Sequence, residues 1–169
     1  MDICLDLIVT MSNSKDLYVI LGNQNSGKST LMRHLSGWLK EKAQPQRLRL
    51  TDDGVLELTV FIRSQQEVPR RVDETLRRVG EASGTAVLIS LWIDGRTEKG
   101  TYYPSGDTYL RALEDHHRIR SICVLSDGSA LPESYSSWSD VIVLERAYDP
   151  MLNQMNQVAA RVRDNWGWV

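Results

Sequence analysis

The sequence predicts an α/β fold, a three-layer αβα sandwich whose mainly parallel sheet is covered by helices on both sides. The pattern of apolar residues along the chain supports this prediction. Short apolar segments rich in β-formers alternate along the chain with segments whose apolar residues recur at helical spacing. Such alternation implies right-handed crossovers between parallel strands. With 169 residues, 41% of them hydrophobic and 25% charged, the chain suits a single domain over residues 1–169.

The first half of the chain is predicted to contain a strand, a helix and a strand pair. Residues 16–21 form an apolar run typical of a buried parallel strand. Apolar residues between Leu31 and Leu39 then recur at helical spacing, so we expect a helix that ends near residues 40–42. The strand pair consists of residues 47–50, a hairpin turn at Asp53-Gly54 and a longer strand over 55–62.

The second half is predicted to continue the alternation, with one long loop. A single apolar stripe indicates a helix between Pro69 and Gly80. Residues 96–106 are polar and rich in turn formers, so we expect a mobile loop rather than a regular element. The remaining predicted elements are a strand over 86–93, a helix over 107–117, strands over 121–125 and 141–144, and a final helix that Asp149-Pro150 caps, with Met151, Met155, Val158, Val162 and Trp166 on one face.

Residues 22–29 read Gly-Asn-Gln-Asn-Ser-Gly-Lys-Ser, which matches the spacing G-x-x-x-x-G-K-[ST] of a phosphate-binding loop between a strand and a helix. Gly22 and Gly27 let successive N–H groups point inward, and the following helix adds the positive end of its dipole. Lys28 is expected to reach the β- and γ-phosphates, and the Ser29 hydroxyl to bind a phosphate-bound Mg²⁺. The predicted nucleotide-contacting residues are Gly22, Asn23, Gln24, Asn25, Ser26, Gly27, Lys28, Ser29 and Thr30.

Through Gly22, Gly27, Lys28 and Ser29 the chain resembles the P-loop NTPase superfamily. This resemblance implies the P-loop NTPase fold, with ATP and Mg²⁺ as ligands. The order of the predicted strands resembles the additional-strand ATPases. Within that division, segments 117–126 and 139–144 faintly resemble viral genome-packaging and DNA-translocating ATPases, although the acidic pair that follows the Walker B strand in those proteins is missing.

Ligands of such sheets bind at the carboxyl ends of the strands, where catalytic partners are expected. Asp94 follows the apolar run 87–93 and resembles a Walker B aspartate, the second holder of Mg²⁺; a turn-forming Asp-Gly pair is the alternative. Gly95 stands where many additional-strand ATPases have the glutamate that polarises water. Glu67, after the 55–62 strand, resembles the catalytic glutamate of recombinase-like ATPases, although an ordinary helix lead-in is also open. The predicted catalytic residues are Lys28, Asp94 and Glu67, and the predicted metal ligands are Ser29 and Asp94.

Several other polar and aromatic residues are candidates for function. Ser126-Asp127 ends a predicted strand where related ATPases sense the γ-phosphate, or it forms a turn with Gly128. An arginine finger, acting within the chain or across a subunit interface, is sought among Arg70, Arg71, Arg77, Arg78, Arg118, Arg120 and Arg146; the first four also suit a solvated helix face. Trp166-Gly167-Trp168 is expected to clamp onto the domain or to form an exposed partner surface.

Composition limits the partners and the compartment. A net charge of −2 and a pI near 5.9 give no global drive toward nucleic acid, so such contact would need a local patch. Cys4 and Cys123 each lie in apolar runs and suit buried free thiols in a reducing compartment, with a cytoplasmic location as the expectation. The apolar stretch 3–9 is too short to span a bilayer, so no membrane span is expected. Residues 1–10 form either an extension or an edge strand.

Three functions follow from these features. The leading prediction is a Mg²⁺-dependent ATP-binding ATPase that assembles into a homo-oligomer whose neighbouring subunits supply missing catalytic groups. The second is a small-molecule or nucleotide kinase in which residues 96–106 or the arginine-rich helix close over the phosphates. The third is a nucleotide-dependent switch without turnover, suggested by Gly95. A GTPase is disfavoured because the sequence contains no Asn-Lys-x-Asp tetrapeptide.

Overall fold

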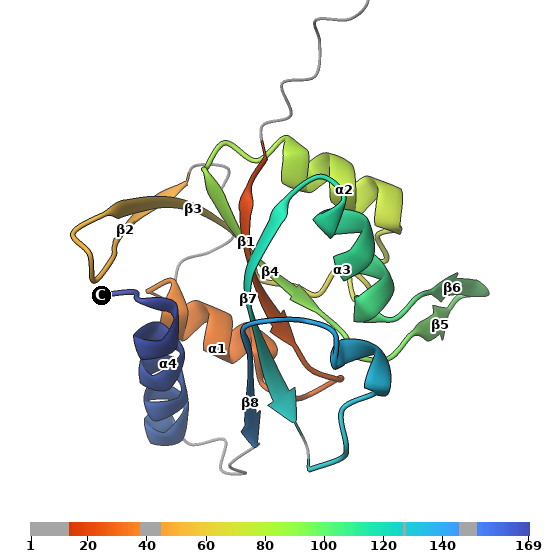
Figure 1. Cartoon of the computed structure of the whole chain (residues 1–169). Helices are drawn as coiled ribbons and strands as arrows, with labels where there is room; N and C mark the ends of the chain where they lie inside the picture. Colours follow the sequence, from red (N-terminus) through yellow and green to blue (C-terminus); the bar gives the residue numbers. More distant parts are fainter. Residues whose placement is uncertain (1–13, 38–44, 127, 146–151) are drawn as a thin grey trace, which may run out of the picture.

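The computed structural model describes residues 14–37, 45–126, 128–145 and 152–169, and in this part a six-stranded sheet forms the centre of an α/β fold (Figure 1). The strands lie in the order β2 (Gln46–Arg49), β3 (Val55–Phe61), β4 (Ala86–Leu91), β1 (Asp16–Leu21), β7 (Arg118–Ser126) and β8 (Val141–Glu145). All neighbouring pairs are parallel except β2 with β3, which form an antiparallel hairpin. The predicted mainly parallel sheet is therefore confirmed.

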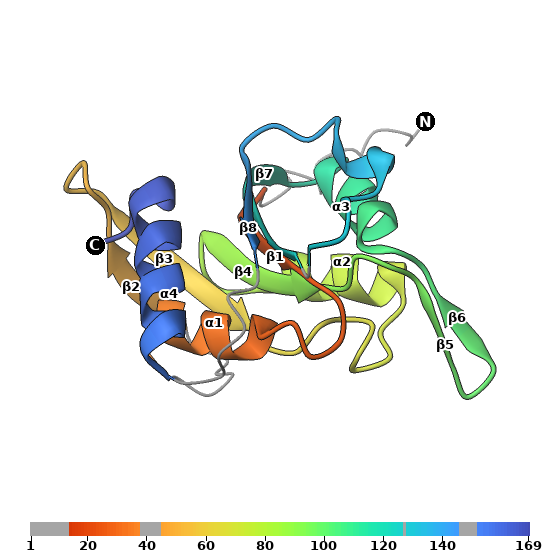
Figure 2. The same ribbon diagram turned by 90° about the horizontal axis from the view of Figure 1, so that it is seen from below.

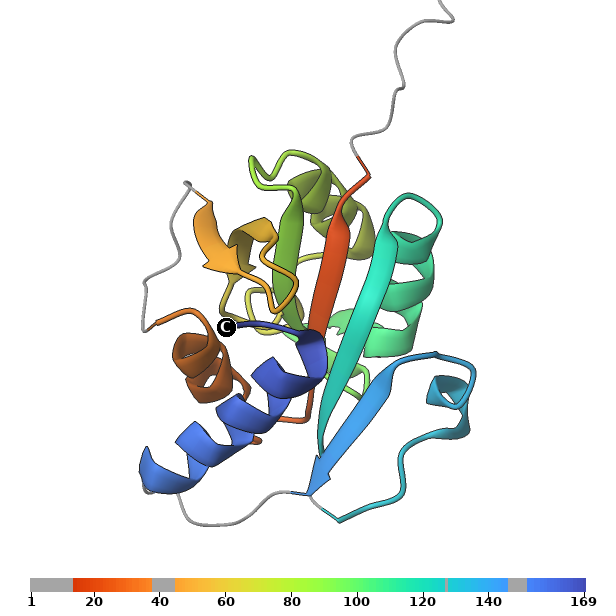
Figure 3. The same cartoon turned by 60° about the vertical axis from the view of Figure 1, so that its left-hand side comes forward.

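Helices cover both faces of the sheet (Figures 1 and 2). One face carries α1 (Lys28–Leu35) and α4 (Leu152–Trp166), and the other carries α2 (Val72–Gly80) and α3 (Gly106–Glu114). Figure 3 shows α4 lying across its face of the sheet beside α1. This arrangement is compatible with the predicted αβα sandwich.

Alternation along β1 divides the apolar core into two layers. Successive side chains of a strand point to opposite faces. Tyr18 and Ile20 therefore join the core under α1 and α4, while Leu17, Val19 and Leu21 join the core under α2 and α3. Each of the five is buried, so this central strand is covered on both sides and its carboxyl end leads directly into the candidate site.

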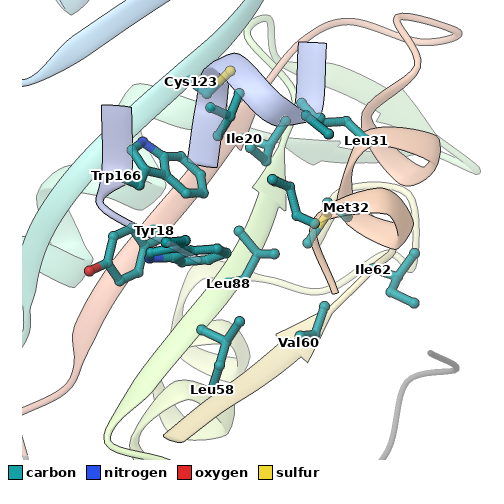
Figure 4. Close-up of a cluster of buried hydrophobic side chains, with 14 of the residues drawn as sticks. Tyr18, Ile20, Leu31, Met32, Leu58, Val60, Ile62, Leu88, Cys123 and Trp166 are labelled. Carbon is teal, nitrogen blue, oxygen red and sulfur yellow. The ribbon is translucent and has the colours of Figure 1, made fainter. Parts of the chain in front are cut away.

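The C-terminal tryptophans clamp the end of α4 onto the body of the domain (Figure 4). Trp166 and Trp168 are both buried, and their rings lie about 5 Å from the ring of Tyr18 on β1. The backbone N–H of Val169 donates to the carbonyl of Arg49 at 3.0 Å, which ties the chain end to β2. The predicted clamp is therefore confirmed. The alternative, an exposed partner surface, is wrong because both tryptophans are buried.

Two sequence predictions about elements are wrong. The helix expected to end near 40–42 ends at Leu35, because Gly37 adopts a left-handed conformation with φ of 69° that stops the helix. The segment expected to be a loop forms a two-stranded hairpin, β5 (Arg96–Glu98) and β6 (Thr101–Tyr103). Its turn has positive φ at Lys99 and Gly100, the backbone that suits right-handed strand twist, so the turn formers make a hairpin here.

Smaller boundary differences occur at the other elements, such as α3 ending at Glu114 and β7 beginning at Arg118. Cys123 is buried and free, as predicted. Some predictions concern residues outside the described part of the chain, namely residues 1–10 with Cys4, Asp127, Arg146, the pair Asp149-Pro150 and Met151. In the described part, no helix is long and apolar enough to cross a membrane.

Candidate functional site

The Gly22–Ser29 loop connects the carboxyl end of β1 to the start of α1, as its spacing predicts. The N–H of Gly22 donates to the carbonyl of Leu91 at 3.2 Å, which holds the start of the loop against β4. The N–H of Ser26 donates to the carbonyl of Asn23 at 3.2 Å and closes a tight turn. The loop therefore lies at the edge of the sheet where ligands of α/β folds bind.

Both glycines of the motif suit the close packing of the loop. A Cβ atom on Gly22 would lie 2.3 Å from the Ser26 hydroxyl oxygen, so a side chain there would require the Ser26 side chain or the loop to shift. Gly27 has a φ of 87°, in the left-handed region that glycine enters without strain. The loop is a close-packed backbone curve, and its two glycines are the residues that permit it.

The start of α1 is arranged to attract an anion. Gly27 occupies the N-cap position and offers no side chain to the first N–H groups of the helix, and Asp and Glu are absent from its first turn. These N–H groups have no partners within the helix, and they carry the positive end of its dipole. Lys28, Ser29 and Thr30 form this first turn, so their N–H groups point toward the loop that precedes the helix.

Lys28 is buried, with 6% of its surface exposed, and its ammonium has neutral hydrogen-bond partners. Its Nζ donates to the carbonyl of Asn23 at 2.7 Å and to the Ser26 hydroxyl at 3.4 Å. Burial lowers the pKa of Lys28 to about 8, and the negative charge of Glu67 opposes part of this shift. A phosphate would provide the counter-charge that this desolvated ammonium gains most from, so the loop fits a polyphosphate.

Asp94 lies beside the loop and bonds to Asn23. The Asn23 side-chain amide donates to Asp94 Oδ2 at 2.8 Å, and the Asp94 backbone N–H donates to Asn23 Oδ1 at 3.2 Å. The structure therefore brings Asp94 beside the loop, and its role as a holder of Mg²⁺ stays a prediction. These two bonds join Asp94 to the first half of the loop, whereas the predicted metal ligand Ser29 belongs to the second half.

Ser29 faces a different set of oxygen atoms. Its hydroxyl makes a long hydrogen bond of 3.5 Å to the carbonyl of Ile62, just after β3. The hydroxyl of Ser90, on β4, donates to the same carbonyl at 3.2 Å and lies 3.3 Å from the hydroxyl of Ser64. The side chains that bond to this carbonyl are neutral hydroxyls, and the Asp94 hydrogen bonds go to Asn23 instead.

The segment after β3 contributes Glu67 and two glutamines. Glu67 is exposed, and its charge acts on the Lys28 ammonium, so the structure places it within electrostatic reach of the loop. Gln66 is fully buried: its amide donates to the carbonyl of Trp92 and accepts from the Trp92 N–H. Gln65 accepts from Arg70 and donates to the carbonyl of Arg63. Glu67 is therefore the exposed carboxylate of this segment, whereas both glutamines serve the fold.

A small pocket of about 140 Å³ opens between the loop and the end of β7. It is lined by Asn23, Gln24, Ser26, Ile93, Asp94, Val124, Leu125, Ser126, Ser129, Ala130, Leu131 and Pro132. The Ser126 hydroxyl donates to the carbonyl of Ser129 and accepts from the Gly128 N–H, which is the predicted turn. Drug-sized ligands need roughly 300 Å³ or more, so this pocket suits one part of a ligand only.

The arginines at the start of β7 do not reach the loop within the same chain. Arg118 pairs with Asp16 in the sheet register, and Arg120 Nε donates to Asp16 Oδ2 at 2.9 Å. Asp16 begins β1, so both arginines lie at the amino edge of the sheet, opposite the loop. The prediction of either as a finger within its own chain is therefore wrong, because a strand's two ends lie on opposite edges.

The arginines before and along α2 mostly have partners of their own. Arg71 and Arg77 form exposed ion pairs with neighbouring carboxylates, Arg70 bonds to Gln65, and the Arg78 guanidinium lies 4.2 Å from the ring centroid of Phe61. Sequence reasoning missed Arg96, whose guanidinium lies 4.1 Å from the ring centroid of Trp92, while Lys28 Nζ lies 6.0 Å from the same centroid. Arg96 lies in the segment that the sequence predicts to be a loop. Its position two residues after Asp94 is the one sequence feature that indicates it lies near the site.

Among the described residues, no group of three or more His, Cys, Asp or Glu side chains is placed to hold a metal ion. Mg²⁺ in nucleotide sites is held by substrate phosphates and a few protein oxygens, so Ser29 fits that chemistry. Compared with protein-family models, curated proteins and solved structures, the chain shows no match. The function is therefore argued from the site itself.

Proposed function

We propose that this protein binds a nucleoside triphosphate with Mg²⁺ through the Gly22–Ser29 loop, in a P-loop NTPase fold. One observation carries the proposal. The buried ammonium of Lys28, with its pKa lowered to about 8, lies at a helix start whose N-cap is a glycine, and the loop curves in the way its glycines permit. Desolvated positive charge beside oriented N–H groups is the arrangement that stabilises a polyphosphate.

Within this function, ATP hydrolysis is the leading reaction. A bound Mg²⁺ would neutralise phosphate charge, and Ser29 would hold it with its hydroxyl. Glu67 is the exposed carboxylate near Lys28 and would orient or activate a water molecule. Arg118 and Arg120 lie at the far edge of the sheet, so an arginine supplied to the phosphates from there would come from a neighbouring subunit of a homo-oligomer.

A kinase is the second candidate, and the sheet order favours it. β1 and β4 are hydrogen-bonded neighbours. The additional-strand division takes its name from a further strand between the loop strand and the aspartate strand, and such a strand is missing from this part of the described sheet. The hairpin β5–β6, which leaves the carboxyl end of β4, would cover an acceptor bound beside the phosphates.

Radiolabelled γ-phosphate release from ATP and GTP with Mg²⁺, at several protein concentrations, tests the proposal. Lys28→Ala is the informative variant, and Arg33→Ala is its matched control, because Arg33 is an exposed residue on the same helix. We expect release that Lys28→Ala abolishes and Arg33→Ala retains, with a rate per subunit that rises with concentration. Transfer that requires an added acceptor would select the kinase. Equal behaviour of wild type and Lys28→Ala in both binding and turnover would overturn the proposal.

A further inference from the structure

Asn23 and Asp94 make a reciprocal pair that fastens the loop to the chain beyond β4. The two hydrogen bonds, of 2.8 and 3.2 Å, use the Asn23 amide nitrogen and oxygen and the Asp94 carboxylate and backbone N–H. Both atoms of the amide are therefore engaged with one residue. A side chain held at two points is fixed in orientation, so Asn23 cannot rotate without breaking both bonds.

The backbone of Asn23 is also the anchor of the loop. Its carbonyl accepts the Ser26 N–H that closes the turn, at 3.2 Å, and the Lys28 ammonium at 2.7 Å. The Asn23 side chain is thus held by Asp94, while its carbonyl orients Lys28. Asp94 is linked in this way to the group that would meet the phosphates, through one intermediate residue.

The place beside Ser29, by contrast, is taken by hydroxyls. Ser29 and Ser90 share the carbonyl of Ile62 as acceptor, at 3.5 and 3.2 Å, and Ser90 and Ser64 are both buried. Ser90 is a strand residue of β4, whereas Asp94 comes three residues after the strand ends. A serine of β4 therefore shares an acceptor with the hydroxyl predicted to bind Mg²⁺, whereas Asp94 bonds to Asn23.

We infer that Asp94 is a positioning residue which latches the loop through Asn23, rather than the second holder of Mg²⁺. The inference rests on the proposed function for its meaning, because the latch holds the loop in the shape that receives phosphates. In this account the ion is held by the Ser29 hydroxyl and by phosphate oxygens. The negative charge of Asp94 is then not required, whereas its ability to accept a hydrogen bond is.

The variant Asp94→Asn separates the two roles, because asparagine accepts the same hydrogen bond without the charge. The measurement is the dissociation constant of ATP with Mg²⁺ and without it, by titration calorimetry. We expect the dissociation constant of Asp94→Asn for Mg²⁺-ATP to stay within about twofold of the wild-type value. Asp94→Ala and Asn23→Ala are each expected to weaken binding about fivefold or more without Mg²⁺, and the double variant to be no weaker than the single ones within about twofold.

A loss of about tenfold or more in Mg²⁺-ATP affinity for Asp94→Asn would identify Asp94 as a metal holder and overturn the latch. Additive losses in Asn23→Ala and Asp94→Ala would overturn it as well. Hydrogen exchange without nucleotide provides an independent readout: the Ser26 amide should exchange faster in Asn23→Ala and Asp94→Ala and at the wild-type rate in Asp94→Asn. Hydrogen exchange tests the Asn23–Asp94 latch without nucleotide. If no nucleotide binds, the proposed function is overturned, and the exchange rates still show whether the latch holds the loop.

Discussion

Two buried lysines lie at opposite ends of the central strand β1, and they differ in what surrounds them. Lys15 precedes the strand, is 5% exposed, and donates to the carbonyl of Gly84 at 2.9 Å. Lys28 follows the strand, is 6% exposed, and sits in a glycine-bounded loop at the start of a helix. The first ammonium fastens two segments together. The second stands among N–H groups that favour an anion, so similar burial serves structure at one end and, we propose, binding at the other.

Replacing each lysine by alanine gives the largest expected contrast. Lys28→Ala should weaken nucleotide binding about 100-fold or more, because a phosphate loses a charge-assisted hydrogen bond. It should leave the unfolding free energy unchanged or higher, since a desolvated charge is removed. Lys15→Ala should keep the affinity and lower the unfolding free energy by about 1–3 kcal/mol, because the Gly84 carbonyl loses its buried donor. Titration calorimetry and urea denaturation measure both, and the contrast fails if Lys15→Ala also abolishes binding.

Two glycines allow the same comparison with smaller effects. A Cβ on Gly84 would lie 2.4 Å from the backbone carbonyl oxygen of Glu57, so Gly84→Ala should lower the unfolding free energy by about 1–3 kcal/mol through overpacking. A Cβ on Gly22 would meet the Ser26 hydroxyl, so Gly22→Ala should instead open the loop and weaken nucleotide binding about tenfold.

The Gly22 effect has a direct control. Adding Ser26→Ala to Gly22→Ala removes the oxygen that the new Cβ meets, so the double variant should recover part of the lost affinity. The same calorimetric titration and denaturation series applies to all of these variants. No recovery in the double variant would show that the Gly22 contact does not control the loop.

The pH dependence of binding should follow the ammonium of Lys28. Its pKa is lowered by burial to about 8 in the nucleotide-free protein, and a bound phosphate would retain the proton. The dissociation constant should therefore be flat below about pH 8 and rise at most about tenfold per pH unit above it. For stability the sign is opposite: the cost of burying the charge is fully present below about pH 8 and is relieved as pH rises toward the usual value of 10.5.

Calorimetric titrations between pH 7 and pH 9.5 at constant Mg²⁺ measure this dependence. Lys28→Met is the control, because it keeps most of the side-chain volume and removes the titrating group. A Lys28→Met protein that binds weakly but shows the same rise above pH 8 would assign the dependence to another group.

The smallest effect is expected at the amino edge of the sheet. Arg120 Nε donates to Asp16 Oδ2 at 2.9 Å, and both side chains are partly exposed to solvent. Arg120→Ala should therefore lower the unfolding free energy by about 0.2–1 kcal/mol and leave nucleotide affinity unchanged. Urea denaturation in low and high salt checks the first point. A loss of turnover only at high protein concentration would instead indicate that Arg120 acts on a neighbouring subunit.

Local patterns predicted most of the sheet, because each parallel strand is an apolar run whose character is independent of its neighbours. The failures depended on single backbone conformations. Gly37 ends α1 where the apolar repeat alone would continue through Leu39, and the positive φ of Lys99 turns a polar segment into a hairpin. Patterns of hydrophobicity carry no information about either conformation.

The sequence predicts the phosphate-binding loop of the candidate site, but not the contacts that join this loop to other segments. Gly22, Gly27, Lys28 and Ser29 are recognisable because the motif encodes one continuous backbone shape. The Asn23–Asp94 pair, the Ser29–Ser90 neighbourhood and the Trp92–Arg96 contact join different segments, and they depend on which strands are adjacent. Sheet order is a property of the whole fold, so spacing along one sequence did not reveal these contacts.

The comparison between the two ends of β1 is tested most directly by amide chemical shifts during a titration with Mg²⁺-ATP. We expect saturable shifts of the amides of residues 22–30 at the carboxyl end, and unchanged shifts of the amides around Lys15 and Gly84. In the Lys28→Ala protein, the amides of residues 22–30 should show no saturable shift. Shifts centred on the amino end, or no saturable shift in the 22–30 loop, would contradict the assignment of this loop as the nucleotide site.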